Sequence, residues 1–406
     1  AREPFFIMFA NAAPSNRLSM AFLRVLLALA ALAGVSDAFV APAVRARAPL
    51  SSRLQMQASR ESVLIIGGTR FAGAYLWREL KNRGHDVTLY NRGRTLPKII
   101  PGESDAEFEA RCRGTKCIVG DRTDPEQLRS LIDPSAYTYV YDMNGRERTD
   151  TAPLADLFNS PRSALKSFVY MSSAGVYKKS QEMPHFEVDE VDPKSRHKGK
   201  LETEAYLRSL GPSFNWCSIR PTYICGPQNY NPVEQYFFER VDAGRPVIIP
   251  SHGEHLTGLG HVQDLAVAMA NVIGREQRTN QQVYNIQNTG AISFNGVARA
   301  AAKAAGRDPE QLKLVHFDPK AVKFPEGAKA FPMRPQHFFT NVDKARRDLD
   351  WEPQYNSAEA ILADSYVNDF LAKKAAGKLK NDFTCDHIIL DGLHNPSAVF
   401  FPSTRA

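Results

Sequence analysis

The sequence has little of what marks disulfide-rich, zinc-binding or membrane-spanning proteins. It contains only five cysteines in 406 residues, and none of them forms a C-x-x-C pair. This sparse, odd-numbered set argues against a disulfide framework and a cysteine-rich zinc site, and indicates thiols in a reducing compartment. No apolar run after residue 60 reaches the roughly 18–20 residues that cross a membrane. With 43% hydrophobic and 23% charged residues, the composition excludes bulk disorder and leaves a globular chain of about two domains.

The excess of basic residues is concentrated at the N-terminus. The formal net charge of +7 comes from 51 basic and 44 acidic residues. Residues 1–60 hold seven arginines and two acids, so the other 346 residues hold 44 bases and 42 acids. A basic binding surface on the body of the protein must therefore arise from local arrangement rather than from bulk charge.

Residues 1–60 have the composition of a targeting leader and are excluded from the fold. Residues 21–35 form a short apolar stretch that ends in small residues, as in a secretory signal. Residues 38–60 contain arginine and serine but no acid, which is typical of a transit peptide. Together they resemble the bipartite leader of plastids with extra membranes, so we expect the plastid stroma, with plain secretion as the alternative. Met20 is the expected true start.

A glycine-rich turn follows the first strand of the body. Ser62–Ile66 is a short β-rich run, the turn spans Gly67 to Gly73, a helix is expected over 71–83, and the next strand over 86–91. This order within about 30 residues is the context that a dinucleotide-binding fingerprint requires. Gly67 permits the tight turn and Gly73 lets the helix approach the strand. The helix N-terminus then faces a pyrophosphate, although a purely structural turn is the alternative.

Strands and helices continue to alternate after this unit. Further strands are expected over 117–121, 137–143, 167–173 and 215–221, with helices around 125–132, 151–159 and 198–210. This alternation predicts an α/β fold of the Rossmann type, a doubly wound parallel sheet with right-handed crossovers.

The pattern changes after residue 221, where prolines punctuate shorter mixed elements. We expect a smaller mixed α/β domain on the substrate side of the sheet, interleaved with it. The predicted division is a leader over 1–60, a dinucleotide-binding domain over 61–221, the smaller region over 222–375 and a tail over 376–406.

Several motifs make the chain resemble the extended short-chain dehydrogenase/reductase and sugar-nucleotide epimerase superfamily. They are the turn Gly67–Gly73, Gly120-Asp121-Arg122, Ser172-Ser173, the helix with Lys200, Arg220-Pro221 with Gly226-Pro227, and His261-Val262-Gln263-Asp264. The resemblance implies NAD or NADP as cofactor, Asp121 at the adenine, and Ser172 and Lys200 at the catalytic centre. Arg70 replaces the middle glycine of the turn.

One departure from the superfamily bears directly on its chemistry. The resemblance places a catalytic tyrosine four residues before Lys200, and that position is Arg196. The phenol serves as acid and base in the hydride chemistry, whereas an arginine does not release its proton. Conventional dehydrogenation or epimerisation is therefore not expected.

A plastid branch of the superfamily, whose members bind stem-loop RNA, carries the same departures. The matching segments include 141–147, 172–177, 192–204, 226–234 and 335–339, within a resemblance that runs from about 62 to about 390. This resemblance implies binding of structured plastid RNA, a Mg²⁺-stimulated endoribonuclease activity, and association with ribosomes or the transcription machinery. Because many superfamily members associate through helices of the sheet, a homo-oligomer is also an expectation.

The candidate site residues fall into three sets. Those expected at the dinucleotide are Gly67, Gly68, Thr69, Arg70, Phe71, Gly73, Asn91, Arg92, Asp121, Arg122, Asn144 and Lys200. Strand two ends without an acid for a ribose hydroxyl and is followed by Arg92, which favours NADP over NAD. Those expected at RNA phosphates are Lys194, Arg196 and Lys198, with a solvated loop as the alternative. Ser172, His197 and Lys200 are the catalytic candidates, without an assigned reaction.

No spacing of carboxylates or histidines singles out a metal site. Asp121, Asp142 and Glu204 are only positional candidates for Mg²⁺. Tyr230, Tyr236, Phe237 and Phe238 provide either stacking faces for unpaired bases or core side chains.

Three functions remain in competition at this point. The first is an RNA-binding protein, with or without nuclease activity, on a dehydrogenase scaffold. The second is an NAD(P)-dependent sugar-nucleotide epimerase, dehydratase or reductase that uses another acid with the intact Lys200. The third is a scaffold in which dinucleotide binding changes the affinity for RNA.

Overall fold

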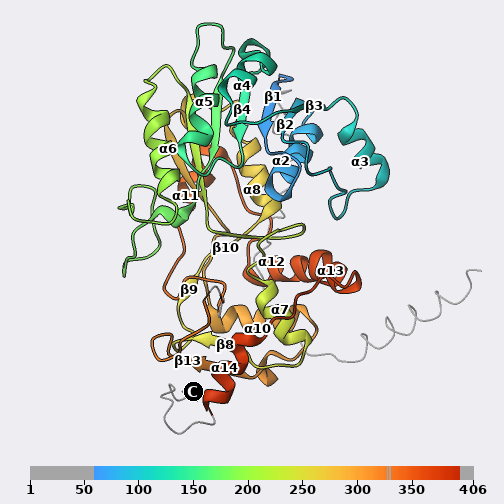
Figure 1. Cartoon of the computed structure of the whole chain (residues 1–406), viewed down its shortest axis with the longest axis vertical. Helices are drawn as coiled ribbons and strands as arrows, with labels where there is room; N and C mark the ends of the chain where they lie inside the picture. The colour runs from blue at the N-terminus through green and yellow to red at the C-terminus, as the bar shows by residue number, and fades with distance from the viewer. Residues whose placement is uncertain (1–58, 327, 329–330, 394–406) are drawn as a thin grey trace, which may run out of the picture. The chain divides into compact units, whose positions relative to one another are not determined.

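A seven-stranded parallel sheet forms the upper part of the molecule in the computed structural model (Figure 1). The structure describes residues 59–326, 328 and 331–393, so the leader predicted for residues 1–60 lies almost wholly outside them. The order is β11-β6-β5-β4-β1-β2-β3. The strands are β1 (Ser62–Ile66), β2 (Asp86–Asn91), β3 (Lys116–Val119), β4 (Tyr139–Asp142), β5 (Ser167–Met171), β6 (Trp216–Pro221) and β11 (Gln282–Ile286). The predicted Rossmann-type α/β fold is confirmed.

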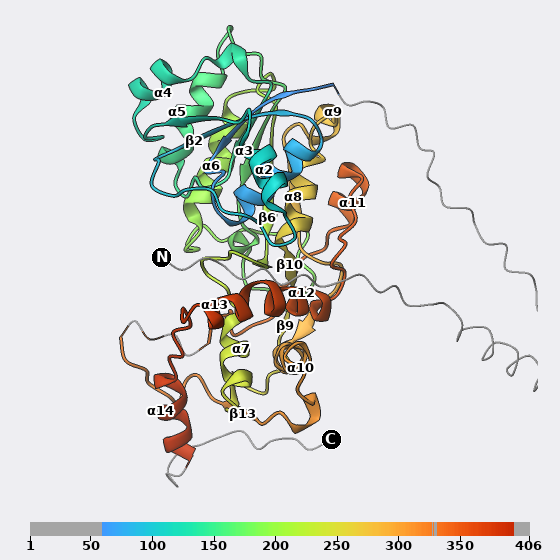
Figure 2. The ribbon, with the colours of Figure 1, turned by 90° about the vertical axis from the view of Figure 1, so that its right-hand side faces the viewer.

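Helices cover both faces of this sheet, which explains why its central strands are almost wholly apolar. The helices of this part are α2 (Phe71–Asn82), α3 (Asp105–Cys112), α4 (Pro125–Leu131), α5 (Arg148–Phe158), α6 (Lys198–Ser209), α8 (Val262–Ala270), α9 (Glu276–Thr279) and α11 (Asp343–Leu349). One core lies between the sheet and α2, α8 and α11. Another lies between the opposite face and α4, α5 and α6, and Figures 1 and 2 show the two layers.

The strand order reverses between β1 and β4. Chain order runs from β1 outward through β2 to β3, and then returns to β4 on the other side of β1. Ile66 of β1 and Asp142 of β4 are in register at the carboxyl ends of these strands. In open α/β sheets a ligand binds outside the carboxyl ends at such a reversal, so the topology places a binding site beside the glycine turn.

The later part of the chain forms a second set of elements with its own core. They are β7 (Tyr223–Cys225), α7 (Gln235–Asp242), β8 (Val247–Pro250), β9 (Leu256–Thr257), β10 (Leu259–His261), β12 (Ile292–Ser293), α10 (Phe294–Ala304), β13 (Leu314–Phe317), α12 (Ala358–Ser365), α13 (Leu371–Ala375) and α14 (Thr384–Leu393). Strands pair as β7–β10, β8–β13 and β9–β12. Phe237, Phe238 and Phe294 are buried in the core around α7, α10 and α12.

The tail expected over 376–406 contains a packed helix, α14. Asp386 on this helix is 1% exposed and accepts a hydrogen bond from Arg240 of α7 at 2.6 Å. Ile389 joins a small core with Ile248 and Phe317. Residues 384–393 of the predicted tail are therefore a packed helix, which the sequence did not reveal because partners such as Arg240, 146 residues before Asp386, meet it only after folding. None of the helices in the described ranges has the length and apolarity needed to cross a membrane.

Candidate functional site

The glycine turn between β1 and α2 brings helix and strand unusually close together. Gly67 has a φ of +89°, which a residue with a side chain adopts only with strain. A Cβ on Gly73 would lie 2.5 Å from the carbonyl oxygen of Gly67. Glycine is therefore required at both positions. The N-terminus of α2, with its free N–H groups, opens at the reversal of the sheet, and this geometry fits a dinucleotide pyrophosphate.

The turn is connected to the second set of elements through Tyr230. Phe71 has a φ of +40°, a strained conformation for a bulky residue that is often found at functional sites. Its ring lies edge-on to the Tyr230 ring at 6.2 Å, and the Arg70 guanidinium lies 4.8 Å from the centre of the same ring. Arg70 makes no side-chain cap for α2, so the arginine in the middle of the turn contacts an aromatic face. Tyr230 itself is 64% exposed.

The residues at the ends of β2 and β3 are exposed or committed to local turns. Asn91 accepts a hydrogen bond from the Gly93 N–H at 2.8 Å, and Arg92 is exposed. Asp121 accepts hydrogen bonds from the backbone and hydroxyl of Thr123. These bonds lower the pKa of the Asp121 carboxyl, and the charge of Arg92 contributes to the shift. Asp121 thus caps the turn at the end of β3 with its carboxylate.

Arg122, which the sequence places among the dinucleotide contacts, directs its guanidinium into the protein. Its guanidinium is buried and forms a bidentate ion pair with Asp142, at 2.7 and 2.5 Å. Its remaining N–H groups reach Asn144 Oδ1, the carbonyl of Asp150 and the hydroxyl of Thr151. All five donors are therefore occupied. Arg122 instead positions Asn144, whose side chain lies 3.0 Å from where a Cβ of Gly67 would be.

Lys200 projects from α6 towards the ends of β4 and β5. Its ammonium group donates to the carbonyl oxygens of Gly145 at 2.5 Å and Met171 at 2.6 Å. Burial lowers the pKa of Lys200 to about 8, although the nearby Asp142 carboxylate opposes the shift. One N–H of the ammonium remains for a ligand, so Lys200 fits a ribose hydroxyl of a bound dinucleotide.

Arg196 and His197 occupy the space beside Ser173 where the superfamily resemblance implies a phenol. Arg196 Nε donates to His197 Nε2 at 3.1 Å. Burial, together with the charges of Arg196, Arg334 and Lys200, lowers the pKa of His197 to about 4. His197 is therefore neutral near pH 7. Ser172 Oγ is buried and has no hydrogen-bond partner within the described part of the chain, so a polar ligand atom could satisfy it.

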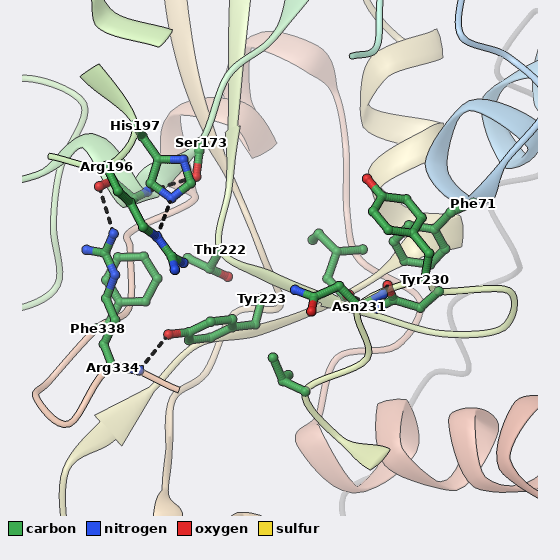
Figure 3. Close-up of a pocket in the computed structure, with 14 residues that line it drawn as sticks. Phe71, Ser173, Arg196, His197, Thr222, Tyr223, Tyr230, Asn231, Arg334 and Phe338 are labelled. Atoms are coloured by element: carbon green, nitrogen blue, oxygen red, sulfur yellow. Dashed lines mark hydrogen bonds between the residues drawn. The ribbon is translucent and has the colours of Figure 1, made fainter. Parts of the chain in front are cut away.

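A cavity of about 230 Å³ lies between these residues and the glycine turn (Figure 3). One end is lined by Ser173, Arg196, His197 and Arg334, and the other by Phe71 and Tyr230. Its remaining lining residues are Gly175, Thr222, Tyr223, Ile224, Asn229, Asn231, Val233 and Phe338. The cavity thus combines cationic and aromatic groups, which suits an anion attached to a flat ring.

Arg334, Tyr223 and Phe338 were not singled out as site residues from the sequence. Arg334 donates to the carbonyl of Gly175 at 2.8 Å, and its backbone N–H donates to the Tyr223 hydroxyl at 2.8 Å. Its guanidinium lies 4.7 Å from the centre of the Phe338 ring. The only sequence signal was that Arg334 directly precedes a segment matched to the plastid branch, 335–339.

The predicted RNA-contact residues lie at the start of α6. Lys194, Arg196 and Lys198 are all exposed. The loop that carries them is held to the chain after β5, because Ser195 Oγ donates to the Gly175 carbonyl at 2.8 Å and the Asp192 N–H donates to the Val176 carbonyl. The three cations are therefore presented from a fixed loop next to the cavity.

The positional candidates for Mg²⁺ do not come together. Asp142 is paired with Arg122, and Glu204 is buried in a bidentate pair with Arg220. Asp121 is exposed at the end of β3. Over the described ranges, no group of three or more histidine, cysteine, aspartate or glutamate side chains could hold a metal ion. The described carboxylates therefore do not fit a magnesium centre.

The aromatic residues after β7 divide between core and surface. Phe237 and Phe238 are buried in the core, and Tyr236 packs against that core and donates to the Ile248 carbonyl. Tyr230 alone of the four predicted stacking residues is exposed and lines the cavity.

The sequence matches the model of the NAD dependent epimerase/dehydratase family over residues 63–286. It is 46% identical over 334 residues to the chloroplast stem-loop binding protein of 41 kDa b from Arabidopsis thaliana, covering 82% of this chain and 85% of that protein. It is 28% identical over 330 residues to the chloroplastic divinyl chlorophyllide a 8-vinyl-reductase of Oryza sativa subsp. indica, covering 77% of this chain and 72% of that protein.

Solved structures agree with the fold. The UDP-glucose 4-epimerase of Thermotoga maritima superposes with a TM-score of 0.60 at 19% identity, covering 77% of this chain and 99% of that one. The UDP-Glc/GlcNAc 4-epimerase of Campylobacter jejuni superposes with a TM-score of 0.59 at 18% identity, covering 75% and 98%. At these identities the likeness concerns the fold.

Proposed function

Because the chain belongs to the NAD dependent epimerase/dehydratase family, we propose that it is a plastid protein that binds stem-loop RNA on a dinucleotide-binding scaffold. The observation that carries this proposal is the 46% identity to the Arabidopsis stem-loop binding protein over 82% of the chain. Plastid localisation is supported by that relative, which is chloroplastic, and by the leader-like composition of residues 1–60.

The arrangement of cations supports the RNA-binding function. Lys194, Arg196 and Lys198 are exposed in the loop before α6 and at its first residue, where they form one group of cations that can contact phosphates. Such contacts release counterions, so the affinity falls as salt rises. Because the body of the chain has almost balanced charge, this local group is the expected electrostatic contact.

The scaffold binds NAD or NADP, and we propose NADP as the preferred form. Asn91 at the end of β2 has a single acceptor oxygen, which already accepts from the Gly93 N–H, where a carboxylate would offer two oxygens to a ribose diol; Arg92 and Arg94 are exposed beside it. Their charges suit a 2′-phosphate. The affinities for NADPH and NADH, measured by nicotinamide fluorescence in wild type and Arg92→Gln, test this preference.

A sugar-nucleotide epimerase, dehydratase or reductase remains the second candidate. Lys200 at the ends of β4 and β5, and the buried Ser172 Oγ without a partner in the described part of the chain, favour it because they are the groups that the superfamily resemblance implies at a catalytic centre. Arg196 opposes it, because a guanidinium cannot cycle a proton at neutral pH. Turnover of a UDP- or GDP-sugar that disappears in Lys200→Met would replace the RNA-binding proposal.

The test of the main proposal is fluorescence anisotropy with a labelled plastid 3′ stem-loop over a salt series. We expect log K to fall linearly with log salt, and each neutralised phosphate contact in Lys194→Gln or Lys198→Gln to reduce the slope by about 0.7–0.9. Lys303→Gln is the matched control, because Lys303 is exposed on α10 and paired with Glu359. The proposal fails if binding is undetectable or independent of salt.

Cleavage, its stimulation by Mg²⁺, and association with ribosomes or the transcription machinery are expectations of the family resemblance. Asp142 and Glu204 are committed to buried arginines, so neither gives support to a magnesium-dependent step. Self-association is likewise an expectation, and the mass of the purified protein in solution tests it.

A further inference from the structure

Two arginine side chains line the cavity without a carboxylate partner. Over the described ranges, neither Arg196 nor Arg334 forms an ion pair with an acidic side chain, whereas the buried Arg122, Arg220 and Arg240 each do. Arg334 is held in place by the Gly175 carbonyl rather than by a charge. Its pKa is lowered by burial and by the charge of Arg196, while Asp192 and Tyr223 oppose the shift.

Like charges brought together in this way favour an anionic ligand. The closest histidine, His197, is neutral and contributes no further charge. A phosphate between the two guanidinium groups would satisfy donors that no side chain satisfies, and arginine is well matched to phosphate geometry. Asp192 is the acid that faces Arg334 from the loop before α6, and its carboxylate is already bonded to the Lys194 N–H.

Aromatic rings line the opposite end of the same cavity. Tyr230 is exposed there, and Figure 3 shows Tyr230 and Phe71 together across the space from Arg196. Base stacking on an aromatic side chain tolerates any base and is the usual way in which proteins hold unpaired nucleotides. A volume of about 230 Å³ is below the roughly 300–1,000 Å³ of pockets that enclose a drug-sized ligand. It therefore suits one nucleotide unit of a longer chain.

We propose that this cavity takes one unpaired nucleotide from the loop of the bound RNA, with its phosphate between Arg196 and Arg334 and its base against Tyr230. This inference rests on the proposed RNA-binding function. The RNA-binding surface then has two parts. Lys194 and Lys198 contact the backbone of any structured RNA, whereas the cavity binds only RNA with an unpaired nucleotide and so distinguishes a loop from a continuous duplex.

The test compares a stem-loop with a blunt duplex of the same stem sequence. Arg196→Gln should weaken stem-loop binding about tenfold and leave duplex binding within about twofold of wild type. Lys198 is a neighbouring exposed cation outside the cavity lining, so Lys198→Gln should lower the affinity for both RNAs by the same factor. Equal losses of both RNAs in Arg196→Gln would overturn the inference, since Arg196 would then be only a backbone contact.

Tyr230 provides a second variant that does not endanger the fold, because its side chain is largely exposed. The Tyr230→Leu variant should bind the stem-loop no more tightly than the duplex. The Tyr230→Phe variant, which keeps the ring, should still bind the stem-loop more tightly. If Tyr230→Leu retains it, the stacking part of the inference is wrong. If wild type binds neither RNA, the proposed function itself fails.

Competition with a free nucleotide separates the cavity from other RNA-binding surfaces. Adenosine monophosphate should displace the stem-loop but not the duplex, and should do so less well in Arg196→Gln. A mononucleotide that binds wild type and not Arg196→Gln, yet leaves stem-loop affinity unchanged, would show that the cavity holds a small nucleotide instead and would overturn the inference.

Discussion

Arg196 donates its Nε–H to Nε2 of His197 at 3.1 Å. Burial, and after it the charge of Arg196 in the position where a catalytic phenol is expected, lowers the pKa of His197 and keeps its imidazole neutral. A proton on His197 Nε2 would point at a guanidinium, which raises the energy of the charged ring. At this position the charged guanidinium of Arg196 and the neutral ring of His197 stand where a tyrosine would donate a proton. This arrangement favours binding of an anionic ligand over proton transfer.

The stability of the protein should depend on pH through His197. Its pKa is about 4 in the folded protein and near 6.5 in an unfolded chain, so the unfolded state binds more protons between these values. The free energy of unfolding is therefore highest above about pH 6.5 and falls as the pH is lowered towards 4. After allowance for partial exposure, we expect a loss of about 1–2 kcal/mol.

Urea unfolding at pH 7 and pH 5 measures this effect, with His197→Gln as the comparison because glutamine can still accept the Arg196 hydrogen bond. The variant should show a smaller difference between the two pH values. An NMR titration in which the His197 ring protonates near pH 6.5 would contradict the prediction.

Breaking the buried Arg122–Asp142 pair should be costly. Asp142 is fully buried, and Asp142→Asn leaves the Arg122 charge without a counterion inside the protein. We expect a loss of about 3–5 kcal/mol in the free energy of unfolding, measured with urea. Glu359→Gln, which breaks the exposed pair with Lys303, should cost less than about 1 kcal/mol. Equal effects of the two substitutions would show that Arg122 finds another partner.

A methyl group on Gly73 should weaken dinucleotide binding. The new Cβ would lie 2.5 Å from the Gly67 carbonyl oxygen, a contact that forces α2 away from the turn. We expect Gly73→Ala to weaken NADPH binding at least about tenfold and to lower stability by about 1–3 kcal/mol. Gly290→Ala serves as the control, because nothing lies within 4 Å of its Cβ position. Unchanged NADPH fluorescence in Gly73→Ala would place the cofactor elsewhere.

Helix α14 should stabilise the second set of elements through one buried contact. Asp386→Asn leaves Arg240 of α7 with a neutral partner, and we expect a loss of about 2–4 kcal/mol. Thermal unfolding of this variant beside Asp382→Asn, which changes an exposed residue just before the helix, measures the difference. A Tm shift of the same size in both variants would exclude the buried pair as its cause.

The central sheet could be predicted because its signals are local. A glycine turn, strongly apolar strands and regular alternation identify β1 to β6 without knowledge of their neighbours. Helix α3 was not predicted, because it buries little apolar surface; its signal was the capping box of Ser104 and Glu107.

Candidate site residues could be singled out where one short motif carries them, and were overlooked where folding brings distant segments together. The turn glycines and Lys200 belong to recognisable motifs, and the structure brings them to one edge of the sheet. The ion pair of Arg122 was not foreseen because its partner Asp142 lies on another strand. Arg334 was missed because it approaches Gly175 from 159 residues away. Sequence spacing does not reveal which side chains converge after folding.

Strand β11 has a consequence for how the protein is made. Gln282–Ile286 pairs with β6 and forms the outer strand on that side of the sheet, although the intervening chain builds much of the second set of elements. While the chain emerges from its N-terminus, β6 remains a bare edge until residue 286 has been synthesised, and exposed edges invite aggregation. A fragment that stops at residue 221 lacks the outer strand of the sheet and leaves the apolar strand β6 unpaired on that side, so we expect shortened versions of this protein to stay soluble only when they extend past β11.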